Sequence, residues 1–424
     1  MENKKVLILS VPSWNKKSGS DTFSSLMEGY GADNVANIYI REDLPDSKVC
    51  NNYFRISENA VIKSIFKRNI KTGKQVFAEC VVDDNIQNRT KTKERYRKYS
   101  KKRNIFFLLL REIFWKIGKW RSKELDDFID DFSPDVVFFS MEGYIHLDRI
   151  ARYVIKKTGA KGIGYFWDDN FTYKKSKRAS FRFYRFFQRR ELKKCVKLCT
   201  DFFAISPKTK KEADEVFNIN CMLLTKPIES SGEFSDYKIS SPIKMIYTGK
   251  LIIGRFDTIK IIGNALDEIN ADKTRIILDV YTTTELTSEE KNSLSSYVNV
   301  LGAIPQDEVF LKQKQADILL FAEAISGKSA LTARLSFSTK LTDYFRSGKC
   351  ILAVGNADTA PIEYLKQEDA AIVALDYEGI INAINTILKN EKVVLEYAKK
   401  AFRCGQNNHN KEKIQKLLFK TINS

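Results

Sequence analysis

Short apolar runs alternate with amphipathic stretches along most of the chain. In the first half, the apolar runs occupy residues 6–11, 35–40, 135–140, 161–167, 201–206 and 221–225. Between them, apolar residues recur at helical spacing at 23, 26, 27 and 30 and near 147–157, and Pro207 stands where another helix would begin. Apolar strands that alternate with helices are typical of a parallel sheet covered by helices on both faces.

The alternation stops at residues 226–242, which are rich in Ser, Pro and Gly, and then starts again. Six further apolar runs follow, at 243–249, 274–282, 298–302, 316–322, 349–355 and 370–376. We therefore predict an α/β fold with two tandem doubly wound, Rossmann-like domains, residues 1–228 and 229–404. A C-terminal helix at 405–424 is expected to pack back on the first domain. Ligands bind beyond the carboxyl ends of strands in such sheets, so the two domains should face a cleft.

The formal net charge of +18 and the pI of about 9.3 add a preference for anionic partners to this picture. The seven cysteines form no CxxC pair and only two histidines are present, which favours a reduced, cytoplasmic chain without a structural metal. The apolar run at the N-terminus ends after Val11, too early for a signal peptide, and no run is long enough to span a membrane.

Two segments, residues 91–123 and 174–197, combine many lysines and arginines with aromatic residues and contain few acidic ones. Three interpretations are open: a solvated helix face over core aromatics, an anionic membrane surface, or nucleic acid. We favour the membrane, because basic amphipathic helices with aromatic residues bind anionic lipid and no nucleic-acid motif is present. The chain is thus expected at the inner face of the membrane, without a nucleic-acid partner.

A cluster of hydroxyls and a lysine precedes a short predicted helix in the second domain. Leu341, Tyr344 and Phe345 would form the buried face of this helix, and Gly348 would end it. Ser338 or Thr339 then falls at the N-cap, with Lys340 beside it and Asp343 one turn into the helix. A capped helix is an ordinary structural feature, but a helix start with an adjacent cation also favours an anion.

A second cluster lies at the end of the first strand of the same domain. Gly249, Lys250, Gly254 and Arg255 all follow the run at 243–249. Glycines permit close approach of the backbone to a ligand, and two cations suit a diphosphate. Because both clusters are predicted at carboxyl ends of strands in one sheet, they point to one anion site.

These residues resemble the donor domain of nucleotide-sugar glycosyltransferases of the GT-B fold, especially those like family 4. Gly249-Lys250-Leu251 with Arg255 is similar to the family's G-(R/K)-L…(K/R) motif. FSTKLTDY at 337–344 and SGKCILA at 347–353 are similar to its (P/S)-S-K-L-x-(E/D)-Y and (S/A)-G-x-P-(I/V)-L-A motifs. The resemblance covers roughly the second domain, whereas the first domain matches in the order of its elements.

The resemblance implies a role for each matching residue. Lys250 and Arg255 would neutralise the donor diphosphate, and Asp343 would bind the ribose hydroxyls. Ser338, Thr339 and Lys340 would hold phosphate. Gly302 and Ile304 would border the base. Ser18 and Gly19 would form a small-residue loop near the diphosphate. No metal is implied, since cations and helix dipoles neutralise the leaving group in this fold.

The sequence departs from the family pattern at one position that matters for chemistry. Many family 4 members have a glutamate eight residues before the ribose carboxylate, and this chain has Leu335 there. The preceding loop offers Glu323 and Arg334 instead. The stereochemical course is therefore left open.

In the first domain, carboxylates follow two predicted strands. Asp168 and Asp169 follow the run at 161–167, where either could act as a catalytic base on an acceptor hydroxyl or serve as a turn cap. Glu142 and His146 follow the run at 135–140, and His146 is expected to be structural.

We therefore expect a metal-independent glycosyltransferase that takes its sugar from a UDP- or GDP-sugar and needs no further cofactor. Its acceptor would be a hydroxyl of a glycan, lipid-linked, in the synthesis of a cell-surface polysaccharide or glycan. Two alternatives stay open: a nucleic-acid-binding protein and a catalytically silent scaffold with the same fold.

Overall fold

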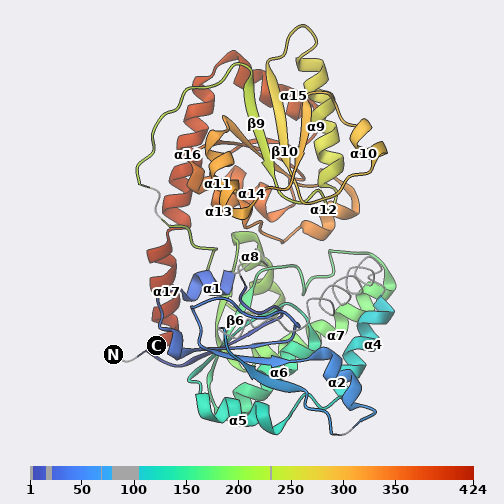
Figure 1. Cartoon of the computed structure of the whole chain (residues 1–424), viewed down its shortest axis with the longest axis vertical. Coiled ribbons are helices and arrows are strands. Elements are labelled where there is room, and N and C mark those ends of the chain that lie inside the picture. The colour runs from blue at the N-terminus through green and yellow to red at the C-terminus, as the bar shows by residue number, and fades with distance from the viewer. Residues whose placement is uncertain (1–2, 16–21, 68, 79–104, 230–231) are drawn as a thin grey trace.

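The computed structural model describes residues 3–15, 22–67, 69–78, 105–229 and 232–424. These residues form two α/β domains, one above the other in Figure 1. Each domain is built around its own sheet, of eight strands in the first and six in the second. The predicted fold class is confirmed.

The first sheet has the strand order β4-β3-β2-β1-β5-β6-β7-β8, and each strand is parallel to its neighbours except β4, which runs antiparallel to β3. Its strands are β1 Val6–Ser10, β2 Val35–Tyr39, β3 Asn52–Ile56, β4 Gly73–Val76, β5 Val136–Ser140, β6 Lys161–Phe166, β7 Cys199–Ala204 and β8 Met222–Leu223. Six of these match the predicted runs, and β3 and β4 were not predicted.

The two faces of the first sheet are covered by different helices. One face packs against α1 (Thr22–Met27) and α17 (Lys411–Asn423), the last helix of the chain. The other face is covered by α4 Ile105–Ile117, α5 Lys123–Phe132, α6 Ile145–Thr158, α7 Ala179–Val196 and α8 Pro207–Phe217. The short helix α2 (Glu58–Ser64) lies beside α4 at the edge (Figure 1).

The second sheet has the order β11-β10-β9-β12-β13-β14 and is parallel throughout. Its strands are β9 Ile243–Thr248, β10 Ile276–Tyr281, β11 Val298–Gly302, β12 Ile318–Ala322, β13 Cys350–Val354 and β14 Ile372–Ala374, one in each of the six predicted runs. The helices are α9 Arg255–Ile269, α10 Ser288–Asn292, α11 Gln306–Gln315, α12 Gly327–Ala333, α13 Lys340–Ser347, α14 Ala360–Gln367, α15 Tyr377–Lys389 and α16 Lys392–Asn408.

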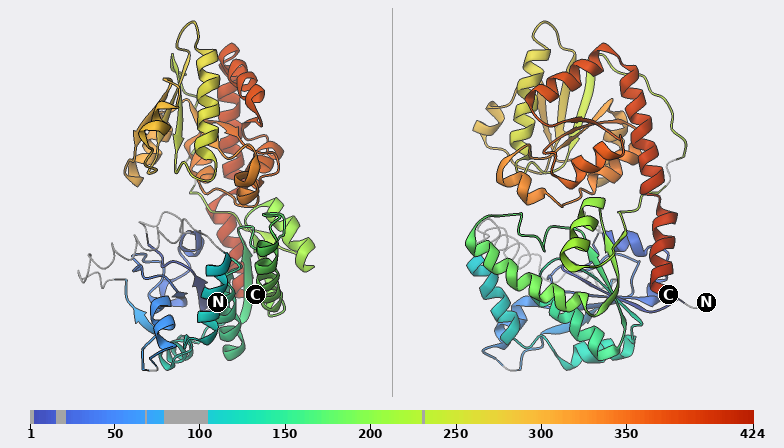
Figure 2. Two further views of the ribbon diagram at one scale, coloured as in Figure 1. Left: turned by 90° about the vertical axis from the view of Figure 1, so that its right-hand side faces the viewer. Right: turned by 180° about the vertical axis from the view of Figure 1, so that it is seen from behind.

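The last helix crosses back to the first domain. Lys411 Nζ lies 2.7 Å from a carboxylate oxygen of Glu28, and the rings of Phe419 and Tyr30 are 4.9 Å apart. Figure 2 shows α17 beside the first domain and α16 beside the second. The two domains are therefore joined both by the segment after β8 and by the connection between these helices.

Both sheets reverse their strand order at an internal pair of strands. In the first sheet the reversal lies between β1 and β5, and in the second between β9 and β12. Helices leave such a pair to opposite sides of the sheet, so a crevice opens beyond its carboxyl ends, and ligands bind there in open α/β sheets. The fold therefore directs attention to the residues that follow β1, β5, β9 and β12.

Candidate functional site

An ion pair spans the crevice of the second sheet. Arg255 begins α9, and Glu323 directly follows β12. The guanidinium donates two hydrogen bonds to the carboxylate, with Nη2–Oε1 and Nε–Oε2 distances of 2.7 and 3.1 Å. Two parallel bonds fix the guanidinium in one plane, so Arg255 is held at the mouth of the crevice before any ligand binds.

Lys340, the first residue of α13, reaches the same crevice. Its Nζ lies 3.2 Å from the hydroxyl oxygen of Tyr247 and 4.4 Å from the centre of that ring. Burial, together with the positive charge of Arg255, lowers the pKa of Lys340 to about 7. The charged form of this lysine is therefore unfavourable in the free protein, and a bound anion would stabilise it.

Gly249 provides the room for this lysine. It has a φ of 138°, and a Cβ at this position would lie 2.9 Å from Lys340 Nζ. A side chain at position 249 would therefore be strained and would displace the lysine.

The amino end of α13 adds a partial positive charge. Thr339 occupies the N-cap, and its side chain makes no capping hydrogen bond within the described residues. Gly348 ends the helix with a φ of 68°, as predicted. Free amides at a helix start, combined with the dipole, bind anions. Ser338 and Thr339 thus lie at the helix start, next to Lys340.

The other predicted donor residues lie around this centre. Lys250 is exposed, and its carbonyl accepts a hydrogen bond of 2.9 Å from the Tyr247 hydroxyl. Gly302 ends β11 with a φ of 78°, and Ile304 is half-buried nearby. Asp343 is half-buried on α13, and burial raises the pKa of its carboxyl. Ser18 and Gly19 lie outside the described residues.

The structure thus brings Arg255 and Lys340 together and leaves the Lys250 side chain towards solvent. Sequence reasoning missed Tyr247, which orients Lys340, although it stands two residues before the conspicuous Gly249. It identified Glu323 but did not predict the ion pair of this carboxylate with Arg255. The binding roles of these residues remain predictions.

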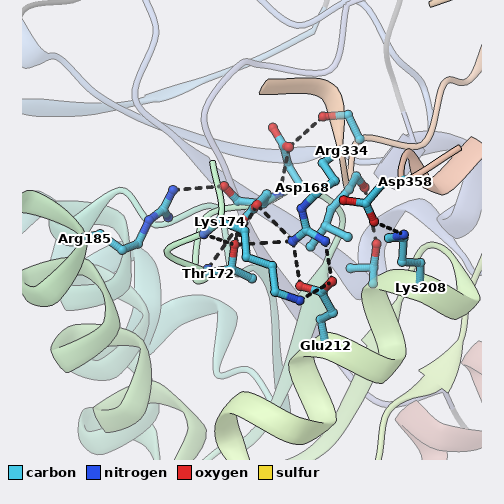
Figure 3. A network of polar contacts seen from close by, with 12 residues as sticks. Asp168, Thr172, Lys174, Arg185, Lys208, Glu212, Arg334 and Asp358 are labelled. Carbon is cyan, nitrogen blue, oxygen red and sulfur yellow. Dashed lines mark hydrogen bonds and ion pairs between the residues drawn. The ribbon is translucent and has the colours of Figure 1, made fainter. Parts of the chain in front are cut away.

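A network of polar contacts joins the two domains, and we call it the seam (Figure 3). Arg334, which follows α12, donates hydrogen bonds through both Nη atoms to the carboxylate of Glu212 on α8. Lys208, also on α8, lies 2.6 Å from carboxylate oxygens of both Asp358 and Glu363 of the second domain. Glu212 and Lys208 carry no recognisable motif, and sequence reasoning gave neither a role.

Asp169 belongs to this seam. It is fully buried, and its carboxylate accepts hydrogen bonds from the backbone and hydroxyl of Thr172 at 3.1 and 2.7 Å. Its Oδ2 also lies 3.4 Å from Arg334 Nη2. Through these contacts Asp169 caps a turn and links the two domains; the link was not expected from the sequence, and the catalytic role of Asp169 stays a prediction.

Asp168 lies at the surface of the seam. Its Oδ1 accepts a hydrogen bond of 2.7 Å from Ser336, four residues before Lys340 in the chain. Asp168 is half-buried, so an acceptor could reach its carboxylate more easily than that of the fully buried Asp169. That role is a proposal.

Glu142 stands at the switch point of the first sheet, two residues after β5. Burial raises the pKa of its carboxyl to about 7; a hydrogen bond of 2.8 Å from Ser140 opposes the shift and the charge of Asp168 adds to it. A carboxyl group that titrates near neutral pH can take up or release a proton under physiological conditions.

His146 has a structural environment, as expected. Its Nδ1 lies 2.9 Å from Glu112 and its ring stacks on Trp115, with centroids 4.5 Å apart. Burial lowers the pKa of this imidazole.

In the part of the chain that the structure describes, no three His, Cys, Asp or Glu side chains gather in a way that could hold a metal ion. The described helices include none that is both long and apolar enough to cross a membrane. Metal-independent chemistry remains a prediction.

No protein-family model matches the sequence, and no curated protein matches it in sequence. Solved structures match over nearly its whole length. HepE from Anabaena, in complex with UDP, is 8% identical, covers 99% of both chains and has a TM-score of 0.63. Sucrose-phosphate synthase from Thermosynechococcus elongatus is 11% identical, covers 98% of this chain and 97% of its own, and has a TM-score of 0.57. A glycosyltransferase from Rickettsia africae is 14% identical over 99% of both chains, also with a TM-score of 0.57.

These neighbours and the two facing Rossmann-like domains define the class: the chain has the GT-B fold of glycosyltransferases. At this identity the likeness concerns the fold, so the chemistry must be argued from the residues of the site.

Proposed function

We propose that this protein is a glycosyltransferase that uses a nucleotide-diphosphate sugar as its donor. The observation that carries the proposal is the convergence of Arg255, Lys340 and the open start of α13 at the switch point of the second sheet. Two cations and a helix dipole suit the two phosphates of the donor and the charge that develops on the leaving diphosphate. This set of groups supports transfer without a metal ion.

The comparisons support a uridine nucleotide as the first donor to examine. HepE, which shares the fold, was solved with UDP, with UDP and glucose, and with UDP-glucose. A UDP-sugar or a GDP-sugar is the proposed donor, with Asp343 at the ribose and Gly302 and Ile304 beside the base.

The acceptor is proposed to be a hydroxyl group of a glycan that enters from the side of the first domain. Glu142 and Asp168 follow the neighbouring strands β5 and β6, and the negative charge of Asp168 contributes to the raised pKa of Glu142. One of them would orient the hydroxyl and accept its proton, because the reaction must remove a proton from the acceptor oxygen.

An exposed apolar and basic surface supports a lipid-linked acceptor. On α4, Phe106 and Phe107 are 63% and 50% exposed, and on α7, which contacts α4, Phe183 and Phe186 are 56% and 53% exposed. The same helix α7 carries several cations: Arg182, Arg189, Arg190, Lys193 and Lys194. Aromatic side chains among cations are suited to the interface of an anionic membrane, so we place the enzyme at the cytoplasmic face.

The donor assignment is tested with the purified chain and a panel of UDP- and GDP-sugars, by calorimetry and by release of the nucleotide. Wild type should bind one of them, and Lys340→Met should weaken binding about tenfold or more, since one charge-assisted contact is lost. Lys244→Met is the matched control, because Lys244 is exposed at the opposite end of β9. If no nucleotide-sugar binds at millimolar concentration, the proposal fails.

The lipid component has its own test. Vesicles with anionic lipid should co-float with the wild-type chain and less with a Phe183→Ser, Phe186→Ser variant, while donor binding stays unchanged. A chain that binds donor but ignores such vesicles would retain the transferase proposal and lose the membrane. Partner binding that tolerates Lys340→Met, with no donor bound, would favour the scaffold alternative.

A further inference from the structure

A second cationic pocket lies in the first domain, away from the crevice of the donor. It has a volume of about 560 Å³ and is lined by nine residues, from the end of α4, the loop that follows it and α6. Six of these are cations: Lys116, Lys119, Arg121, Arg149, Arg152 and Lys156. None of the nine is acidic.

The position of α6 sets this pocket apart from the donor site. Helix α6 begins where β5 ends, at the edge of the sheet that faces the second domain, and runs back along the sheet. Lys156 is eleven residues after Ile145, which places it roughly 16 Å further along the helix axis. Arg149, Arg152 and Lys156 follow one another at helical spacing, so they share one face of α6. Figure 1 shows α4, α5 and α6 in the first domain, below the seam.

The walls of the pocket are ordered before a ligand arrives. The rings of Trp120 and Tyr153 meet edge to face at 5.6 Å, and the guanidinium of Arg121 lies 4.9 and 4.7 Å from their centres. The Tyr153 hydroxyl donates a hydrogen bond to Asp126, and Arg152 Nη2 lies 2.6 Å from Glu191. Ordered donors lose little entropy on binding.

In the part of the chain that the structure describes, two guanidinium nitrogens of residues that line the pocket have no hydrogen-bond partner. Arg149 Nη1 and Arg152 Nε are shielded from solvent and have no hydrogen-bond partner among the described residues. Burying a cationic donor without a partner is unfavourable, and gathering like charges around one cavity adds repulsion. An anion with several oxygens would relieve the repulsion among the six cations that line the pocket.

We propose that this pocket binds a phosphate-bearing ligand at a site separate from the donor site. Guanidinium groups match phosphate oxygens in pairs, and the volume of the pocket suits a small phosphorylated group. The phosphate belongs either to a soluble metabolite or to the headgroup of an anionic lipid. The site does not depend on sugar transfer, so failure of the proposed activity leaves it standing.

The test compares two neighbouring lysines of α6 in the full-length chain. Lys156 lines the pocket, whereas Lys157 lies 2.9 Å from Asp130, outside it. Lys156→Ala and Lys157→Ala change the net charge equally, so a difference between them reports the pocket and not the general charge or the donor site. Arg149→Ala provides a second variant within the pocket.

Sodium pyrophosphate and vesicles of phosphatidylglycerol are the two probes, followed by calorimetry and by co-sedimentation. Saturable binding of pyrophosphate that Lys156→Ala weakens about tenfold, and Lys157→Ala less than twofold, supports a soluble ligand. The same difference seen with vesicles alone supports a lipid headgroup. Equal effects of the two substitutions, or no saturable binding of either probe, would overturn the proposal.

Discussion

Arg334 of the second domain and Glu212 of the first form a two-bond ion pair across the seam. Arg334 is 1% exposed, and its Nη2 lies 2.6 Å from Glu212 Oε2 and 3.4 Å from Asp169 Oδ2. The charges of Arg334, Glu212 and Asp169 are shielded from solvent, and each would be unfavourable to bury without an opposite charge beside it. The arginine therefore holds the two domains in the described arrangement.

Replacing this arginine should destabilise the protein severely. Arg334→Met leaves the fully buried Asp169 without its ion-pair partner and Glu212 with only the exposed Lys174, so the free energy of unfolding should fall by about 3 kcal/mol. Equilibrium unfolding in urea measures this loss. Lys208→Met is the control at the same seam: its partners Asp358 and Glu363 are 62% and 33% exposed, so the loss should be about 1 kcal/mol. Equal losses would refute the role given to Arg334.

The affinity for a diphosphate should fall as the pH rises above neutrality. Lys340 in the free protein has a pKa of about 7, below its ordinary value, so it loses its proton between pH 6 and 8. A bound diphosphate favours the charged lysine and raises this pKa, so binding takes up a proton. The dissociation constant for UDP should therefore rise by up to about tenfold per pH unit above pH 7.

Lys340→Arg is the control for this titration, because an arginine keeps its charge throughout the range. Its dissociation constant should vary little between pH 7 and 9, whatever its absolute value. If the dissociation constant of the wild type for UDP varies with pH as little as that of Lys340→Arg, Lys340 does not bind the phosphate.

The missed strand β4 differs in burial from the predicted strands β12 and β13. All residues of β12 and β13 are buried, so both appear in the sequence as unbroken apolar runs. In β4, Lys74 and Gln75 are exposed in an antiparallel strand at the edge of the sheet. Such a strand has no distinctive hydrophobic pattern, and its pairing with β3 depends on the fold around it.

The candidate site was predictable to the extent that its residues are local in sequence. Arg255 and Lys340 each follow a glycine or hydroxyl motif beside a strand, so the sequence located both. Their partners could not be read in this way, because Glu323 meets Arg255 only where β12 and β9 are neighbours. The contact of Asp169 with Arg334 joins residues 165 positions apart, and no spacing rule anticipates it.

Gly254 should be indispensable for the position of Arg255. It has a φ of 77°, and a Cβ there would lie 2.8 Å from the Cβ atoms of Ala324 and Ser329. Gly254→Ala combines backbone strain with a clash against Ala324 and against Ser329 of α12, so the free energy of unfolding should fall by about 3 kcal/mol. Donor binding should weaken as well, since Arg255 is the next residue.

Gly159→Ala separates the two causes. Gly159 has a φ of 70° at the end of α6, but no atom lies within 4 Å of the position of its Cβ. Only backbone strain remains there, and the loss should be about 1 kcal/mol. If both substitutions lower the free energy of unfolding in urea equally, the close contact at Gly254 does not contribute to the loss.

Glu142 should govern the acid side of the pH–rate profile of sugar transfer. Burial raises the pKa of its carboxyl to about 7, so below that pH the group is protonated and unable to accept a proton from the acceptor. The rate should rise with pH through about 7 in the wild type. Glu142→Gln should lower kcat by about 100-fold or more and abolish this limb, which initial rates between pH 5.5 and 8.5 would reveal.

Ser140 offers a second control, because its hydroxyl contacts the Glu142 carboxylate directly. Its hydroxyl donates a hydrogen bond of 2.8 Å to the carboxylate and so favours the charged form. Ser140→Ala should therefore raise the pKa further and move the acid limb to higher pH, with kcat recovered at alkaline pH. Asp168→Asn should move the limb the other way, since the charge of Asp168 contributes to the raised pKa. A limb that stays in place in both variants would assign the proton transfer to another group.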